Sequence, residues 1–368
     1  MISRDHPKGA VAEVFPPGEF IRDELVARSW TQKEFAAILG RPLQTVNQII
    51  NGKKAITPDT AVALAEAFGT SAELWLNLEN AYRLAGANGA DPDVRRRARL
   101  HSLVPLGELI ERRWIKASNN LDDSEAEVCA FLEINCISGD PELPMAARRA
   151  GGYGELSPGQ IAWGFRAKHQ ASAKRIPKFD KERFEQALQT LPKLSVDRKG
   201  MLQVVPTLQQ IGIRVEFVAH LSGTRIDGGM FWLDADSPVV ALSFRYDRID
   251  SFWFTLMHEL AHVHKGHAKV GFLDSDLVGE NAQQPQDKPK YEQLADRLAG
   301  RWLIPRTMLT RFVRQVGPFF SAARIKAFAA EVGVHPGIVV GQLQYQGAIP
   351  WSHHRKMLVK ASDLLVSK

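Results

Sequence analysis

The feature that most constrains how this chain folds is an apolar run, residues 250–264, that carries two histidines four positions apart. Its central part reads F-W-F-T-L-M-H-E-L-A-H and ends at His262. Side chains four residues apart lie on one face of a helix, so His258 and His262 are predicted to point the same way. The large apolar neighbours of the two histidines predict that this helix is buried.

The H-E-x-x-H pattern predicts a zinc site. Two histidines on one helical face bind one Zn²⁺, and the metal makes a water molecule acidic enough to attack an amide near neutral pH. Glu259 is the predicted catalytic residue, which takes the proton of that water and passes it to the leaving amine. An open catalytic site needs a third protein ligand, and Glu292 on a later predicted helix is the expected one. Asp296, one turn beyond Glu292, is predicted to orient a ligand histidine.

The identity of the third ligand has alternatives in the polar connection of residues 266–290. Glu292 is preferred because a helix positions a carboxylate better than a flexible loop does. His264 and His267 are interpreted as surface or supporting residues, since four protein ligands would close the site to water. The acids of the connection that compete with Glu292 are Asp274, Asp276 and Glu280.

The N-terminal part of the chain has the pattern of a helix-turn-helix. Two short predicted helices, residues 31–39 and 42–50, flank a tight turn at Gly40. Glutamine and asparagine recognise adenine edges by paired hydrogen bonds, and lysine binds phosphates. A helical bundle whose polar residues only meet solvent is the alternative. The predicted DNA-binding residues are Gln44, Thr45, Asn47 and Gln48 on the second helix, followed by Lys53 and Lys54.

Residues 15–85 resemble the HigA-type antitoxins of the XRE class. The matching runs are F-P-P-G-E-F-I-R-D-E-L, W-T-Q-K-E-F-A-A-I-L-G, V-N-Q-I-I-N-G-K-K-A-I-T-P-D-T-A and F-G-T-S-A-E-L-W-L-N-L. This resemblance implies a five-helix, lambda-repressor-like domain that binds palindromic operator DNA as a homodimer.

Residues 201–346 resemble the ImmA/IrrE metallopeptidases. The shared pattern is a strand at residues 239–244, the H-E-x-x-H helix, a helix with Glu292 and Asp296, and then L-I-P at residues 303–305. The resemblance implies zinc, a thermolysin-like active-site helix in a minimal peptidase domain, and cleavage of a regulatory protein such as a repressor or toxin.

The rest of the sequence predicts a mainly α protein with a small β-sheet, an α+β fold. The expected parts are a helix-turn-helix domain at residues 1–86, a helical connector at 87–195, the peptidase domain at 196–350 and a basic tail at 351–368. The runs 212–218, 229–233 and 239–244 are the expected strands, being β-rich and bounded by Gly, Asp and Pro. Residues 95–191 show helical patterns.

Net charge, cysteine content and the absence of long apolar segments bear on the partners of the protein and on its cellular location. The net charge of +6 favours polyanions, but charge alone decides little. Cys129 and Cys136, seven residues apart on a predicted helix, are expected to be buried thiols in a reducing compartment. No run resembles a signal peptide or a membrane span, so a cytoplasmic protein with no membrane partner is expected.

Three functions are compatible with these motifs. The leading hypothesis is a transcriptional regulator that binds operator DNA and cleaves a protein partner with a zinc-dependent endopeptidase domain. The first alternative is a HigA-type antitoxin repressor whose C-terminal domain is a non-catalytic interaction module. The second alternative is a peptidase whose N-terminal domain binds protein rather than DNA.

Overall fold

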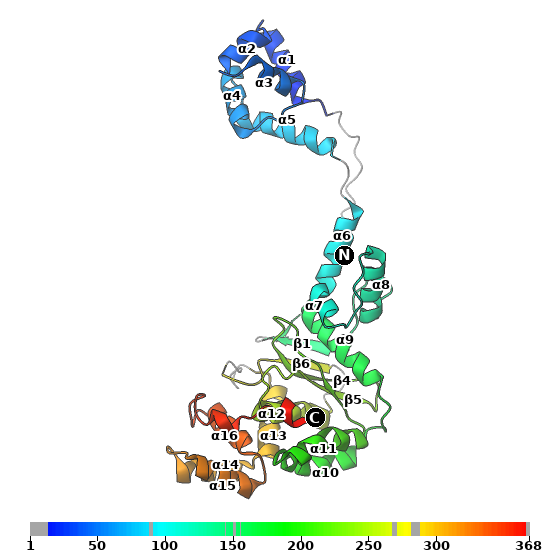
Figure 1. Ribbon diagram of the computed structural model, residues 1–368, viewed down its shortest axis with the longest axis vertical. Helices are drawn as coiled ribbons and strands as arrows, with labels where there is room; N and C mark the ends of the chain where they lie inside the picture. Colours follow the sequence, from blue (N-terminus) through cyan, green and yellow to red (C-terminus); the bar gives the residue numbers. More distant parts are fainter. Residues whose placement is uncertain are drawn as a thin grey trace. The chain divides into compact units, whose positions relative to one another are not determined.

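The computed structural model divides the chain into two compact units, Met1–Asp91 and Pro92–Lys368, and Figure 1 labels most of their helices and strands. The structure describes residues 14–87, 91–143, 145–149, 152–154, 156–266, 271–280 and 288–365. Among these residues the fold is mainly α with one small sheet, which confirms the predicted class. No helix within the described ranges is both long and apolar enough to cross a membrane.

The N-terminal unit is an all-helical domain. Side chains cap three of its helices: Thr31 and Glu34 form a capping box at α2, Thr57 accepts from the Thr60 amide at α4, and Ser71 accepts from the Leu74 amide at α5. Phe35, Phe68 and Trp75 lie at the centre of its core. The described helices are α1 (Pro17–Ala27), α2 (Gln32–Ile38), α3 (Leu43–Ile50), α4 (Pro58–Phe68) and α5 (Ala72–Ala85).

Two glycines shape the N-terminal unit. Gly40 has φ +62°, a left-handed conformation that lets the chain turn sharply between α2 and α3. Gly18 allows α1 to approach the end of α3, because a Cβ on Gly18 would lie 1.9 Å from the carbonyl oxygen of Ile50. The absence of a side chain at Gly18 therefore positions α3 in the domain.

The second unit surrounds a mixed sheet with helices. Its described helices before the sheet core are α6 (Pro92–Leu103), α7 (Leu106–Glu111), α8 (Leu121–Leu132), α9 (Pro158–Ser172), α10 (Lys181–Thr190), η1 (Leu191–Ser195) and α11 (Arg198–Gln210). Those that follow are α12 (Ile249–Lys265), α13 (Lys290–Leu303), α14 (Arg306–Val316), α15 (Ala322–Val332), α16 (Pro336–Tyr345), η3 (Arg355–Met357) and α17 (Ser362–Leu365).

The described strands form one sheet in the order β2-β1-β6-β4-β5-β3. β4 pairs antiparallel with both β5 and β6, whereas β3 pairs parallel with β5, and β1 pairs parallel with β6. The strands are β1 (Met145–Arg149), β2 (Gly152–Gly154), β3 (Arg214–Phe217), β4 (Ile226–Trp232), β5 (Pro238–Leu242) and β6 (Gly271–Ser275).

Three of these strands, β3, β4 and β5, lie at the three predicted runs, and the other three were missed. β1 and β2 interrupt a stretch that was predicted to be helical, and β6 lies in the connection that was predicted to be a loop. β1 and β6 each contain charged residues, so their sequences do not resemble buried strands. Their conformation depends on the pairing of β1 with β6 and of β6 with β4, which tertiary structure imposes over local preference.

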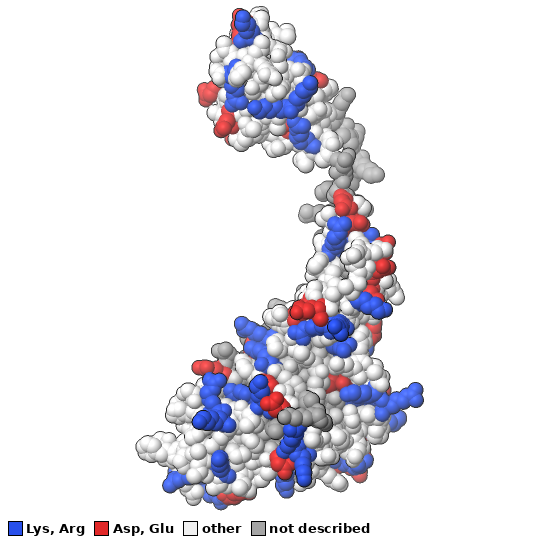
Figure 2. All heavy atoms as spheres, viewed as in Figure 1, with Lys and Arg blue, Asp and Glu red and all other residues white. Residues whose placement is uncertain are grey.

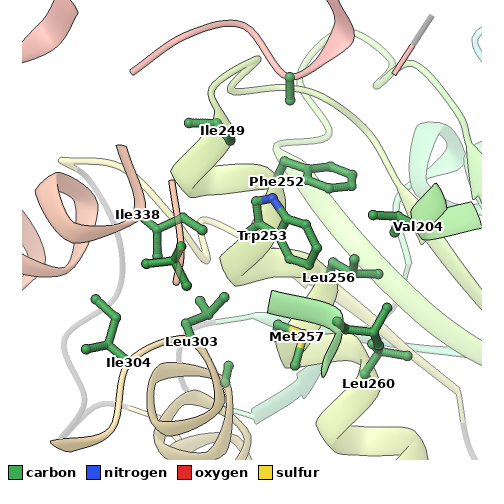
Figure 3. Packing of buried hydrophobic residues seen from close by; sticks show 14 of the residues in the cluster. Val204, Ile249, Phe252, Trp253, Leu256, Met257, Leu260, Leu303, Ile304 and Ile338 are labelled. Atoms are coloured by element: carbon green, nitrogen blue, oxygen red, sulfur yellow. The ribbon is translucent and has the colours of Figure 1, made fainter. Parts of the chain in front are cut away.

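Helix α12 is the centre of the larger hydrophobic core. Figure 3 shows Trp253 and Leu256 of α12 packed beside Leu303 at the end of α13 and Ile338 of α16. The sheet covers another side of α12, because Met230 of β4 belongs to the same core. Helix α12 is therefore packed against the sheet, α13 and α16, as its apolar sequence predicts.

The opposite face of the sheet is covered by α9. Trp163 is fully buried and donates a hydrogen bond from its indole Nε1 to the Val218 carbonyl at 2.8 Å. The helical connector was predicted at residues 87–195. Its described residues from Pro92 onward lie in the same compact unit as the predicted peptidase region, and α6 to α9 share a core with the sheet. The four-part division itself stays a prediction.

Two smaller features differ from their expected form. Cys136 lies beyond the end of α8 and is exposed, and Cys129 is half-buried, so the prediction of two buried thiols on one helix is wrong. The cause is the end of α8 at Leu132, followed by Glu133 in the left-handed conformation. The predicted basic tail folds back in part, because the Ile249 amide donates to the carbonyl of Val359 at 2.9 Å.

Candidate functional site

Helix α12 brings the two predicted ligand histidines together. The Nε2 atoms of His258 and His262 lie 3.0 Å apart, and both side chains are fully buried. Glu259, which follows His258, is also fully buried and lies on the side of α12 that meets β4. The apolar residues around these three side chains account for their burial, since α12 is covered by the sheet and by α13 and α16.

Two carboxylates from separate elements complete the cluster. Glu292 of α13 places Oε2 3.0 Å from His258 Nε2 and 3.6 Å from His262 Nε2. Asp274 of β6 places Oδ2 3.5 Å and 3.9 Å from the same two nitrogens. Asp274 faces α12 because side chains alternate along a strand, and its neighbour Leu273 packs into the core on the other face of the sheet.

This donor set fits a zinc ion. Ligand atoms about 2.0 to 2.2 Å from zinc in a tetrahedron are separated by roughly 3.3 to 3.6 Å. One ligand atom from each of His258, His262, Asp274 and Glu292 lies within 4.8 Å of every other, and all four side chains are buried. Two imidazole nitrogens and two carboxylates concentrated in an apolar core are costly to bury without a cation. The cluster can therefore hold a metal ion.

Asp296 lies on the far side of the His258 ring. Its Oδ1 is 2.9 Å from His258 Nδ1, while His258 Nε2 faces the cluster. The other oxygen, Oδ2, accepts a hydrogen bond from the Nζ of the buried Lys288 at 2.6 Å. A carboxylate in this position keeps the proton of the imidazole on Nδ1 and leaves Nε2 free to coordinate.

Charge interactions shift the pKa values of the cluster when no cation is present. Burial, together with the charge of Asp274, raises the pKa of Glu259 well above its usual range. Burial alone would lower the pKa of His258, but its contacts with Asp274, Asp296 and Glu292 outweigh burial and raise it. Burial and Asp274 oppose ionisation of Glu292, yet contacts with both histidines lower its pKa. The site thus favours positive charge at its centre.

β4 passes directly against Glu259. A Cβ built on Gly228 would lie 2.7 Å from Glu259 Oε1 and 2.6 Å from Thr255 Cγ2. Only glycine permits this approach of a strand to α12. The prediction from sequence missed Gly228, and the pair Gly228-Gly229 inside a β-rich run was the available signal, because glycine in a strand often marks a close backbone contact.

Of the other ligand candidates from the sequence, Asp274 lies in the cluster, whereas Asp276, Glu280 and His264 lie outside it. Asp276 pairs with Arg245 at 2.9 Å, and Glu280 is exposed and outside the cluster. His264 contacts Glu185 at 2.6 Å, away from the other histidines. His267 lies outside the described residues. Asp274 lies in strand β6 and not in a flexible loop. The preference for Glu292, based on the poor positioning of a carboxylate by a loop, therefore does not exclude Asp274 as a ligand.

In the N-terminal unit, α3 separates buried from accessible side chains. Val46, Ile49 and Ile50 are buried in the domain core. Gln44 is exposed, and Thr45, Asn47 and Gln48 are partly exposed. Lys53 and Lys54 are exposed just after α3, where their amides donate to the Gln48 carbonyl at 2.8 and 3.1 Å. The predicted DNA-binding residues therefore share the accessible side of α3 and its end.

An arginine-rich hollow lies next to the metal cluster. Helices α13 and α14 form most of it, and Asp296 and Tyr345 are among its lining residues. Glu331 pairs with Arg311, and no other arginine of the hollow has an ion pair with a described carboxylate. Figure 2 shows that Lys and Arg side chains are distributed over the surface of both units. The arginines of the hollow are Arg297, Arg301, Arg306, Arg311 and Arg314, and all are exposed.

Comparison with known proteins matches both units to families. Residues 21–75 match the helix-turn-helix family, and residues 209–339 match the IrrE N-terminal-like domain. The HTH-type transcriptional regulator YddM of Escherichia coli is 37% identical over 84 residues, which are 23% of this chain and 88% of that protein. The chain belongs to the helix-turn-helix transcriptional regulators. This regulator carries in addition a domain of the IrrE-like peptidase family, so the recognition of both families from sequence motifs is confirmed.

Further relatives match the N-terminal unit. Virulence-associated protein I of Dichelobacter nodosus is 36% identical over 69 residues, 18% of this chain and 64% of that protein. The Pseudomonas aeruginosa antitoxin HigA, solved with the higBA promoter, is 36% identical over 20% of this chain and 80% of its own, with a TM-score of 0.19. A HigA-family addiction module antidote protein from Coxiella burnetii is 30% identical over 30% of this chain and 100% of its own, also with a TM-score of 0.19.

Proposed function

We propose that this regulator binds operator DNA through α3 and cleaves a regulatory protein with a zinc-dependent endopeptidase site. The observation that carries the proposal is the meeting of His258 Nε2, His262 Nε2 and Glu292 Oε2 within 3.0 to 3.6 Å, beside Glu259. The proposal includes that the regulator binds its operator as a homodimer and is located in the cytoplasm.

Each side chain has a distinct task in the proposed reaction. A bound zinc ion supplies the positive charge that makes a water molecule acidic and polarises the scissile carbonyl. Glu259 takes the proton of that water and delivers it to the leaving nitrogen. Asp296 keeps the His258 ring oriented.

The arginine-rich hollow supports a polypeptide as the substrate. It adjoins Asp296 and Tyr345 and is lined by exposed arginines, which attract a segment rich in Asp and Glu. A repressor or a toxin with such a segment fits the proposal.

Metal analysis and cleavage together test this function. Purified protein should contain about one zinc per chain, and His262→Ala should lose most of it, because two histidines and a carboxylate are the minimum of a catalytic site. A peptide library prepared from a bacterial proteome, incubated with excess protein, should yield new termini with the Asp274→Ala variant described below, and none when Glu259→Gln is combined with it. The Glu259→Gln variant should keep its zinc. If the wild type and His262→Ala both contain no zinc after purification without chelator, the proposal is wrong.

A second candidate function has its own supporting observation. The metal cluster and Glu259 are fully buried, as in a structural metal site. This favours the antitoxin alternative, in which the domain binds a partner without cleaving it. Zinc in the wild type without any Glu259-dependent product, even after removal of Asp274 as described below, would decide for that alternative.

A further inference from the structure

The proposed peptidase centre is closed in this structure. His258, His262, Glu292 and Glu259 each have 0% of their surface exposed. A peptidase must bring a backbone carbonyl of an extended chain next to its metal and its general base. Some element of the fold therefore has to leave before a peptide can enter, and the geometry of β6 indicates which one.

The register of the sheet places β6 over the site. Asp274 of β6 lies directly opposite Gly228 of β4, and Leu273 lies opposite Gly229. Gly228 is the residue whose backbone passes against Glu259. β6 thus pairs with the edge of β4 nearest the general base, and extended peptides commonly bind proteins by adding a strand to such an edge.

We propose that Asp274 is a fourth protein ligand of the metal and that β6 occupies the place on β4 where a peptide would pair. This inference rests on the proposed function. The Asp274 carboxylate lies 3.5 and 3.9 Å from the two histidine nitrogens, spacings close to those of ligands around one zinc ion.

Four protein ligands leave zinc no open position for a water molecule. Sites of that kind are structural, whereas catalytic sites keep one position open. β6 therefore acts as an internal substitute for a substrate strand, and its carboxylate takes the coordination position of the water. The domain is latent until β6 separates from β4, and a partner that competes for the β4 edge would activate it.

Contacts at the end of β6 hold the strand in this closed position. Asp276 pairs with Arg245 at 2.9 Å, and the Leu277 amide donates to Asp227 Oδ2 at 2.6 Å. On its other edge β6 pairs with β1. Opening of the site thus breaks these contacts together with the pairing to β4, the packing of Leu273 and the contacts of Asp274 with the two histidines.

Cobalt substitution tests the fourth ligand without relying on activity. The full-length wild type and the variants Asp274→Ala and Asp274→Asn are loaded with Co²⁺, and acetohydroxamate is titrated while the visible spectrum is recorded. The wild-type spectrum should barely respond, because no position is open. Asp274→Ala should bind acetohydroxamate at least about tenfold more tightly. Glu280→Gln, an exposed acid of the same segment, is the matched control and should behave like the wild type.

The outcomes separate this inference from the proposed function. If the wild type and Asp274→Ala each bind one Co²⁺ per chain and respond equally to acetohydroxamate, Asp274 is not a metal ligand. The proposed metal site of His258, His262 and Glu292 would still stand. Failure of the folded wild type to bind Co²⁺ would overturn both. Asp274→Asn preserves the size of the side chain and gives the same comparison if the alanine variant does not fold.

A disulfide across β4 and β6 tests the movement of the strand. Ile226 and Ser275 are directly opposite in the sheet, a spacing that a disulfide can bridge. Cysteines at both positions, with Cys129 and Cys136 changed to serine, should form a bond that fixes β6 on β4. The oxidised protein should lose Co²⁺ to EDTA at least about tenfold more slowly than the same protein after reduction. Equal rates of loss would show that β6 does not gate the site.

Discussion

Asp296 Oδ1 lies 2.9 Å from His258 Nδ1, on the side of the imidazole opposite the nitrogen that faces Glu292. The contact links α13 to α12 through the metal cluster, because Glu292 and Asp296 are one turn apart on the same helix. Two carboxylates of α13 therefore contact the His258 ring: Glu292 lies beside Nε2, and Asp296 lies beside Nδ1. This arrangement orients the ring before any metal binds.

Removal of this contact should weaken metal binding. Asp296→Ala removes the carboxylate that lies beside His258 Nδ1, and the zinc affinity should fall by about 10- to 100-fold. Competition with a chromophoric chelator measures the change. Glu185→Gln is the matched control, since Glu185 contacts His264 on the same helix but outside the cluster and should leave the affinity unchanged. Equal affinities in Asp296→Ala and wild type would mean that packing alone orients His258.

Local sequence patterns predicted α12 and α13 with most of their site residues. His258 and His262 share a face because the helical period places residues four apart together, and Glu292 and Asp296 follow the same rule on α13. The two helices then meet because each carries an apolar face. A periodic pattern within one helix is local information, which a single sequence contains.

Asp274 could not be selected from a periodic pattern within one element. Its strand becomes recognisable only when β4 and β1 pair with it, and the paired residues of β4, such as Met230 opposite Phe272, lie more than 40 positions away in the chain. Nothing in the G-F-L-D-S run distinguishes a buried strand from the polar connection around it. The sequence therefore identified Asp274 as a candidate acid among three but could not select it.

A buried aspartate near the site should make stability depend on pH. Burial raises the pKa of Asp227 from its usual 3.8 to about 7, although backbone hydrogen bonds and Arg245 oppose the shift. The unfolded chain loses this proton near pH 4, whereas the folded protein keeps it until about pH 7. Folding therefore becomes less favourable as the pH rises through that window.

Urea unfolding of the second unit at pH 5 and pH 7.5 measures this effect. Asp227→Asn cannot ionise, so its free energy of unfolding should decrease less than that of the wild type between the two pH values. Asp236→Asn removes an exposed aspartate beside the same sheet and should keep the wild-type difference. A parallel pH response in wild type and Asp227→Asn would place the ionisation of Asp227 outside this range.

A single methyl group should destabilise the N-terminal unit. In Gly18→Ala the new Cβ would meet the Ile50 carbonyl oxygen at 1.9 Å and its carbon at 2.6 Å, and backbone cannot move aside as a side chain can. We expect a loss of about 1 to 3 kcal/mol in the free energy of unfolding of this unit. Gly107→Ala is the control, because a Cβ at that helical position meets nothing within 4 Å. An unfolding transition that is unchanged in Gly18→Ala would show that α1 can shift away from α3.

Operator recognition should divide between base-reading and phosphate-binding residues at α3. Gln44 and Asn47 lie on the accessible side of the helix, and each should contribute about 1 to 3 kcal/mol of discrimination if it pairs with an adenine. Lys53, exposed beyond the helix end, meets backbone phosphates that every sequence shares. Substitution of the glutamine or asparagine should therefore reduce specificity, and substitution of the lysine should reduce affinity for all DNA.

Titration of the full chain with its upstream DNA and with random DNA, at two salt concentrations, separates these effects. Gln44→Ala or Asn47→Ala should weaken the specific complex and spare the non-specific one. Lys53→Ala should weaken both and lower the salt slope by about 1, because one fewer phosphate is neutralised. Lys116→Ala, which removes an exposed lysine of the other unit, is the control. If the wild type distinguishes neither that promoter nor any selected palindrome from random DNA, α3 serves a protein-binding module and the peptidase acts without an operator.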